Sequence, residues 1–134
     1  MILGIPHDEI EEWWPALAPL VRKPLEHEKV KELTTDDILD RIKSRDMQCW
    51  IAHEDGQILS VGITEIIEYP QRRVLGLPFL GAVKGSIDHW FEYFEVIKDF
   101  ARAHDCDVVR IWGRKGWERV MKPDHVRIEA DFEV

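Results

Sequence analysis

The sequence predicts an α+β domain in which a mixed β-sheet is covered by helices. The chain has 134 residues, 45% of them hydrophobic and 33% charged, enough for one core under a charged surface. Apolar residues recur at helical spacing near the amino-terminus and over residues 87–101, and at strand spacing between these segments. A strand–helix–strand order from Val74 to Trp112 implies a parallel pair with a right-handed crossover, while the hairpin before it implies antiparallel strands. A single mixed sheet is therefore expected.

Two helices are expected before the first strand. The first runs from about Asp8 to Val21. Its apolar side chains at helical spacing are Ile10, Trp13, Trp14 and Leu17. Pro15 and Pro19 predict that this helix is irregular or broken, because a proline ring clashes with the preceding turn. Pro24 and the charged run from Glu26 to Glu32 then predict a solvated connection.

The second helix and three strands follow. Thr34–Asp37 supplies a hydroxyl cap and acidic residues in the first turn, so a short helix is predicted to end near Ser44. A strand is predicted over residues 48–53, and Asp55-Gly56 supplies a hairpin turn into a longer strand over residues 58–69. Its residues expected on one face are Ile58, Ser60, Gly62, Thr64 and Ile66. The third strand, Val74–Val83, is apolar on both faces and is expected at a central position.

A long amphipathic helix and three shorter elements complete the expected order. Ser86 is expected to cap the helix, which ends around His104. Its apolar stripe consists of Ile87, Trp90, Phe91, Phe94, Ile97 and Ala101. A strand over Val108–Trp112 and a short helix over Gly116–Met121 follow, and Val126–Val134 alternates as a closing strand.

Charge and apolar patterning exclude several classes of function. Acidic residues outnumber basic ones 26 to 18, giving a net charge of −8, so the chain has no general attraction for nucleic-acid phosphates. The longest apolar stretch, Val74–Val83, is far shorter than the about 20 residues that a membrane helix needs. The amino-terminal residues lack a signal-peptide pattern, and Cys49 and Cys106 are expected to be reduced. A cytoplasmic protein is predicted, with no nucleic-acid or membrane partner.

The order of these segments resembles that of a known superfamily. The helices carrying Thr34–Ile38, the hairpin spanning Cys49–Thr64 and the strand Leu75–Ala82 resemble the first two helices and the second to fourth strands of the GNAT superfamily, the acyl-CoA N-acyltransferase fold. Phe100–Ile111 is similar to that family's helix end and fifth strand. The run Gly113–Arg119 also resembles short GNAT-like proteins encoded by tailed bacteriophages.

The resemblance implies a site for acetyl-CoA or another acyl-CoA. A helix amino-terminus offers free backbone N–H groups and a partial positive charge to a pyrophosphate. In the family, an Arg/Gln-x-x-Gly-x-Gly/Ala loop leads into that helix. The corresponding cofactor-binding residues here are Ala82, Val83, Lys84, Gly85 and Ser86. This loop lacks the arginine or glutamine of the pattern, and Asp88 adds a negative charge in the first turn.

Amine acylation also needs a group that takes the ammonium proton, and often one that protonates the leaving thiolate. The family commonly uses a strand glutamate or a water chain, and a tyrosine after the fifth strand. The sequence contains no tyrosine downstream of Trp112. The candidate catalytic residues are Glu65 and Glu68 on the longer hairpin strand, with His53 and His89 as alternative bases.

Two other clusters have competing interpretations. Cys49, His53, His104 and Cys106 are of types that bind zinc, if a strand and a helix end meet at one end of the sheet. No short Cys-x-x-Cys pair accompanies them, so buried cysteines are favoured and no metal is expected. The second cluster, Trp112 and Trp117 around Arg114 and Lys115, forms either a cation–π patch or core packing beneath a short helix.

Two functions follow from these residues. The degenerate loop and the missing tyrosine favour a catalytically weak or silent GNAT-like protein that acts as a virion or host-interaction component, with other phage or host proteins as partners. The alternative is an acyl-CoA-dependent N-acyltransferase acting on an amine. An exposed cluster around Trp13 and Trp14 would favour the binding role, because large apolar patches mark interfaces. An open cleft beside Lys84 and Gly85 would favour the enzyme.

Overall fold

The α+β class and the mixed sheet are confirmed. A computed structural model describes residues 1–28, 31–83, 90–112, 119 and 121–134. The described elements, in chain order, are β1 (Ile2–Ile5), α1 (Ile10–Glu26), α2 (Thr35–Lys43), β2 (Gln48–Glu54), β3 (Gln57–Tyr69), β4 (Arg72–Ala82), α3 (Trp90–Ala103) and β5 (Val108–Ile111). The sheet order is β1-β2-β3-β4-β5. The β4–β5 pair is parallel and the β2–β3 and β3–β4 pairs are antiparallel, as the strand–helix–strand order and the hairpins predict, and β1 adds a further antiparallel strand beside β2.

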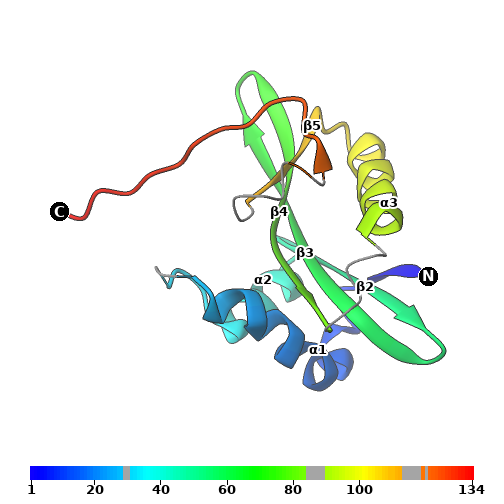
Figure 1. Ribbon diagram of the computed structural model, residues 1–134. Coiled ribbons are helices and arrows are strands. Elements are labelled where there is room, and N and C mark those ends of the chain that lie inside the picture. Colours follow the sequence, from blue (N-terminus) through cyan, green and yellow to red (C-terminus); the bar gives the residue numbers. More distant parts are fainter. Residues whose placement is uncertain (29–30, 84–89, 113–118, 120) are drawn as a thin grey trace.

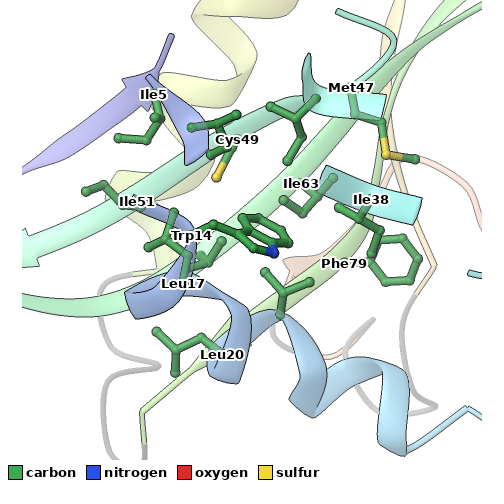
Figure 2. Close-up of a cluster of buried hydrophobic side chains, with 14 of the residues drawn as sticks. Ile5, Trp14, Leu17, Leu20, Ile38, Met47, Cys49, Ile51, Ile63 and Phe79 are labelled. Carbon is green, nitrogen blue, oxygen red and sulfur yellow. The ribbon is translucent and has the colours of Figure 1, made fainter. Parts of the chain in front are cut away.

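Helices cover both faces of this sheet. α1 and α2 lie against one face, and α3 lies against the other (Figure 1). The larger core, between the sheet and α1/α2, includes Trp14, Leu17 and Ile38 from the helices and Ile51 and Ile63 from the strands (Figure 2). The smaller core lies beneath α3 and is formed by Ala52, Leu75, Tyr93, Ile97 and Ala101. β4 is therefore covered on both faces, as its apolar pattern predicts, but it is the fourth of the five described strands and not the central one.

Helix α1 corrects the expectation of a broken helix. It is continuous through Pro15, Pro19 and Pro24 and reaches Glu26, so Pro24 belongs to the helix and not to a solvated connection. Pro15 and Pro19 are exposed, so the carbonyl groups that they leave without an intrahelical donor can be hydrated. The opposite face of α1 is fully packed by Ile10, Trp14, Leu17, Leu20, Val21 and Leu25. This burial stabilises the helix against three prolines.

Gly81 of β4 allows α1 to lie very close to the sheet. A Cβ atom at this position would overlap the backbone carbonyl oxygen of Leu20. Pro24, four residues after Leu20, has no N–H group and therefore leaves that carbonyl without its usual helical donor. Gly81 is thus a packing glycine that receives the backbone of α1.

Helix α2 begins with a complete capping box. The backbone N–H of Asp37 donates to Thr34 Oγ1 at 3.1 Å, and the backbone N–H of Thr34 donates to Asp37 Oδ2 at 2.8 Å. The hydrogen bond from the Thr34 backbone is the main reason that the pKa of Asp37 lies below its ordinary value. The sequence motif predicted this helix and its start correctly.

Removing this cap is expected to lower stability and its dependence on pH. Asp37→Ala removes the carboxylate that accepts from the Thr34 backbone N–H and should lower the free energy of unfolding. Because the pKa of Asp37 is depressed in the folded state, its stabilising effect is present above the unfolded-state pKa and is lost as the pH falls through the folded-state pKa. Urea denaturation at pH 7 and pH 3 should show a smaller difference between wild type and variant at pH 3. An equal difference at both pH values would contradict this account.

The buried face of α3 differs from the predicted stripe. Tyr93, which the stripe omits, is 2% exposed, whereas Phe94 is only partly buried. The Tyr93 hydroxyl donates to the backbone carbonyl of Trp50 at 2.5 Å, and a Cβ at Gly62 would lie 2.7 Å from the same oxygen. A buried tyrosine needs such a partner for its hydroxyl. The predicted cap Ser86 and residue Ile87 lie outside the described residues.

Gly62→Ala is expected to destabilise the protein by about 1–3 kcal/mol, because the added methyl group must displace the buried Tyr93 ring. The measurement is the urea midpoint, compared with that of the double variant Gly62→Ala/Tyr93→Phe. Removal of the hydroxyl should recover part of the loss. If the stability losses of Gly62→Ala and of Tyr93→Phe, each measured alone, add up to the loss of the double variant, the two residues are not in direct contact.

Two expectations about strands differ from the structure: β1 was not predicted, and Ile58 does not share a face with the other four residues assigned to one face of β3. β1 was not expected, because four residues carry too short a pattern. Ile58 packs against the α1/α2 core, whereas Ser60 and Ile66 lie on the α3 side, because the register of β2 and β3 shifts between Ala52 and His53. Such a bulge moves the following side chains to the other face.

The carboxyl-terminal segment Val126–Val134 forms no strand, and its apolar side chains are exposed. It extends away from the sheet as the red tail in Figure 1. Alternation predicts a strand only where a neighbouring edge pairs with it. Most of the short helix predicted over Gly116–Met121 lies outside the described residues. In the part of the chain that is described, no helix has both the length and the apolar character needed to cross a bilayer.

Candidate functional site

β4 and β5, the last two strands of the described sheet, separate partway along β4. Their pairing runs from Val74 opposite Val108 to Leu77 opposite Ile111, where β5 ends, while β4 continues to Ala82. Pro78 follows directly and has no N–H group to donate. Leu77 and Pro78 both lie opposite Thr64, because the register of β3 and β4 shifts between Ile63 and Glu65. This bulge bends β4 where its parallel partner ends.

Beyond this point, one edge of β4 is open. The backbone N–H of Val83 donates to the Leu59 carbonyl at 2.9 Å, so the backbone groups of Gly81 and Val83 face β3. Those of Leu80 and Ala82 therefore face the opposite side, where no strand of the described chain pairs with them. The Ala82 carbonyl accepts a hydrogen bond from Lys23 Nζ at 3.2 Å. Within the described residues no group pairs with the Leu80 N–H and C=O groups, which are therefore candidate partners for a ligand.

A cavity of about 490 Å³ lies beside the separation, on the side of the sheet that carries α1 and α2. Its apolar lining is formed by Leu33, Met47, Pro78, Phe79 and Trp112. Its charged lining is formed by Glu28, Glu32, Arg41, Glu65 and Glu129. The volume is in the range of small-molecule sites, which combine apolar walls with a few polar groups.

The charge of this cavity is strongly negative, with four carboxyl groups and one guanidinium. Burial is the main reason that the pKa of Glu28 lies above its ordinary value, and the carboxylate of Glu32 raises it further, whereas Lys31 opposes the shift. A bound cation would relieve this repulsion between carboxylates. The lining therefore favours a positively charged ligand.

The structure places the predicted catalytic residues differently. Glu65 is partly buried and lines the cavity at the β3–β4 bulge. Glu68 forms an ion pair with Arg73 at the other end of the hairpin, and its side chain is 69% exposed. His53 lies near the end of β2, where its backbone pairs with Met1. His89 lies outside the described residues. Of the predicted bases that the structure describes, Glu65 lines this cavity, whereas Glu68 and His53 do not.

The predicted cofactor loop is only partly described. Ala82 and Val83 are partly buried at the end of β4, whereas Lys84, Gly85 and Ser86 lie outside the described residues, as does Asp88. The loop assignment remains a prediction. Trp112 lines the cavity and contacts Gly76, where an added Cβ would lie 2.9 Å from its ring. Its predicted neighbours Arg114, Lys115 and Trp117 are outside the described residues.

Sequence reasoning missed most of the cavity. Glu28 and Glu32 belong to the run predicted to be a solvated connection, and Glu129 to the predicted closing strand. No sequence pattern indicates Lys23, which belongs to α1 and contacts the end of β4. The only available signal was the excess of glutamate around residues 26–32, which by itself indicates a solvated surface.

The proposed zinc arrangement does not assemble. Cys49 is buried in the α1/α2 core, whereas Cys106 packs against the α3 core, so the sheet separates the two thiols. Burial raises the pKa of Cys49 to about 12, which keeps its thiol neutral near pH 7. Among the residues that the structure describes, no group of histidine, cysteine or carboxylate side chains could hold a metal ion.

The amino-terminal tryptophans do not form an exposed patch. Trp14 is 8% exposed, and Figure 2 shows its ring beside Leu17 and Ile51 within the core. Trp13 is partly buried against the same cluster. The surface that would have favoured a binding role at this place is therefore absent, because both rings are used to pack α1.

Comparison with known proteins gives a fold but no sequence relative. No protein-family model and no curated protein matches the sequence. An aminoglycoside acetyltransferase from an uncultured soil metagenomic sample superimposes with a TM-score of 0.73 at 11% identity, covering 100% of this chain and 94% of that one. The fold is that of the GNAT acetyltransferases.

Two further structures share the GNAT fold. A predicted acetyltransferase with acetyl-CoA from Clostridium acetobutylicum has a TM-score of 0.70 at 13% identity, covering 100% of this chain and 94% of that one. A ribosomal-protein-alanine N-acetyltransferase from Brucella melitensis has a TM-score of 0.65 at 14% identity, covering 98% and 99%. These neighbours come from two bacteria and a soil metagenome, and the resemblance to phage-encoded GNAT-like proteins stays a prediction.

Proposed function

We propose that this chain is an acyl-CoA-dependent N-acyltransferase whose acceptor is a cationic amine bound in the cavity beside Glu65. The observation that carries the proposal is the acidic cavity at the point where β4 and β5 separate. In open sheets with strand–helix–strand units, ligands bind outside the carboxyl ends of the parallel strands. The cavity and the open edge of β4 both lie at that end.

The residues at the end of β4 fit an acyl-CoA. Its pantetheine arm contains two amide groups, which need backbone-like donors and acceptors, and the N–H and C=O groups of Leu80 are such partners. Its pyrophosphate needs positive charge and free N–H groups, which the predicted loop residues Lys84, Gly85 and Ser86 would supply after Ala82 and Val83, where β4 leads toward α3. The donor set is therefore complementary to this cofactor.

The cavity residues then have distinct roles. The bound cofactor supplies the thioester carbonyl that is attacked. Glu28, Glu32 and Glu129 attract the protonated amine, and Glu65 accepts the proton that the amine must lose before it can attack. Attack forms the C–N bond and breaks the C–S bond, and a second amine proton neutralises the departing thiolate. An aminoglycoside acetyltransferase solved in complex with sisomicin has the same fold, which supports an amine acceptor.

A second candidate function is a catalytically silent binding role, with other phage or host proteins as partners. One observation favours it: Ile128 and Phe132 in the carboxyl-terminal tail are 95% and 86% exposed. Exposed apolar side chains of this size often mark an interaction surface. In this case the acidic cavity would have no catalytic use, and the protein would not bind acyl-CoA.

Calorimetric titration with acetyl-CoA and desulfo-CoA separates the two functions. The acyltransferase is expected to bind both at micromolar concentration, more weakly after Lys84→Glu, and to acetylate members of an amine panel. The thermal midpoint of each variant shows whether it is folded. No binding of either ligand at millimolar concentration would overturn the proposed function and favour the binding role.

A further inference from the structure

Lys23 is placed where the predicted cofactor loop begins. It lies in the last turns of α1, and its ammonium group donates to the Ala82 carbonyl at 3.2 Å. The side chain is exposed, and within the described residues no carboxylate lies within ion-pair distance of it. In so acidic a chain, an exposed ammonium group held at a carbonyl and without a carboxylate partner needs an explanation.

The packing of α1 fixes this position. Gly81 has no side chain, so the backbone of α1 at Leu20 reaches β4, and Lys23 follows three residues later in the same helix. The helix therefore brings its cation to Ala82, the last residue of the strand. A lysine ammonium has three N–H donors, so one can remain on the carbonyl while the others bind an anion.

We propose that Lys23 binds the pyrophosphate of the acyl-CoA and supplies, from helix α1, the positive charge that the loop pattern lacks. This inference rests on the proposed function. The predicted loop contains Lys84 but neither the arginine nor the glutamine of the family pattern. An ammonium group at the start of the loop compensates for that loss, because a phosphate needs a nearby point charge more than a particular residue.

The neighbouring residue provides a matched control. Arg22 precedes Lys23 in α1, is also exposed, and lies on a different side of the helix, where it lines a shallow groove with Leu25 and Thr34. Changing either residue to glutamate alters the net charge by the same amount. A general effect of charge on an anionic ligand would therefore appear equally in both variants, whereas a local contact would appear only in Lys23→Glu.

Calorimetric titration of CoA and dephospho-CoA into wild type, Lys23→Glu, Lys23→Gln and Arg22→Glu tests the proposal. Dephospho-CoA retains the pyrophosphate and lacks the 3′-phosphate. Lys23→Glu should raise the Kd of both ligands by the same factor, about tenfold or more. Lys23→Gln should raise the two Kd values less, and Arg22→Glu should change them by less than about twofold. Circular dichroism should show unchanged helix content in all variants.

Failure of the inference differs from failure of the proposed function. If wild type binds CoA and Lys23→Glu binds it equally well, Lys23 has no such role, although the acyltransferase remains. If Arg22→Glu weakens binding as much as Lys23→Glu does, the effect is one of general charge and the inference is overturned. The inference is also overturned if Lys23→Glu weakens the binding of CoA but not of dephospho-CoA, because Lys23 would then contact the 3′-phosphate. If wild type binds neither ligand, both the proposed function and the inference about Lys23 are wrong.

Discussion

Glu65→Gln is expected to lower kcat for amine acetylation by a factor of about 10²–10⁴, which is the usual contribution of a general base. The glutamine keeps the size and hydrogen-bonding capacity of the side chain in the cavity but cannot accept the ammonium proton. KM for acetyl-CoA should change little, because the carboxylate faces the acceptor. Steady-state kinetics with the best amine of the panel provides the measurement.

Glu68→Gln is the matched control for this experiment. It makes the same chemical change three residues along β3, at an exposed side chain paired with Arg73. Its kcat should stay within about twofold of wild type, since exposed ion pairs contribute little. A rise in activity of Glu65→Gln at high pH, where more of the amine is already neutral, would further support the assignment. Equal activity of Glu65→Gln and Glu68→Gln at pH 7 would remove Glu65 from the mechanism.

Gly81→Ala is expected to lower the free energy of unfolding by about 3 kcal/mol, at the upper end of the cost of an overpacked core. The added methyl group would overlap the Leu20 carbonyl oxygen, which belongs to the backbone and cannot rotate away. The helix must therefore move from β4 as a unit, and Lys23 would move with it from Ala82. Urea denaturation measures the loss of stability, and CoA titration reports the displacement of the helix.

Gly76→Ala provides the comparison on the same strand. The Cβ there would lie 2.9 Å from the Trp112 ring, but that side chain is 39% exposed and can swing aside. The expected cost is below about 1 kcal/mol, because a surface side chain relaxes more easily than a helix backbone. If both alanine variants lose the same stability, then Gly81 does not have the packing role inferred here, and its place near the loop needs another explanation.

Much of the fold follows from local sequence. The capping box at Thr34, the Asp55-Gly56 turn and the apolar strand β4 each depend on neighbouring residues, so their patterns predict the observed elements. Asp55 and Gly56 both have positive φ angles, 50° and 75°, as a two-residue hairpin turn of this kind requires. The parallel β4–β5 pair also follows, because a helix must connect two strands that run the same way.

The predictions that are wrong concern positions whose structure depends on contacts with segments distant in the sequence. α1 survives three prolines because its other face packs against the sheet, and Tyr93 is buried because Gly62 leaves room beneath it. The tail has a strand pattern, but no strand of the described residues pairs with it. A propensity or a period describes one segment alone, whereas each of these results depends on a surface supplied by another.

For the candidate site, too, some features follow from the sequence and others only from the contacts that the fold creates. The sequence by itself determined the class of fold, the strand that carries Glu65 and the acidic balance of the chain. Only the tertiary structure decided that Glu28, Glu65 and Trp112 share one cavity while Glu68 does not, and that Lys23 reaches Ala82. A side chain's neighbours across a sheet or a helix interface are fixed by register and close packing, which no local pattern contains.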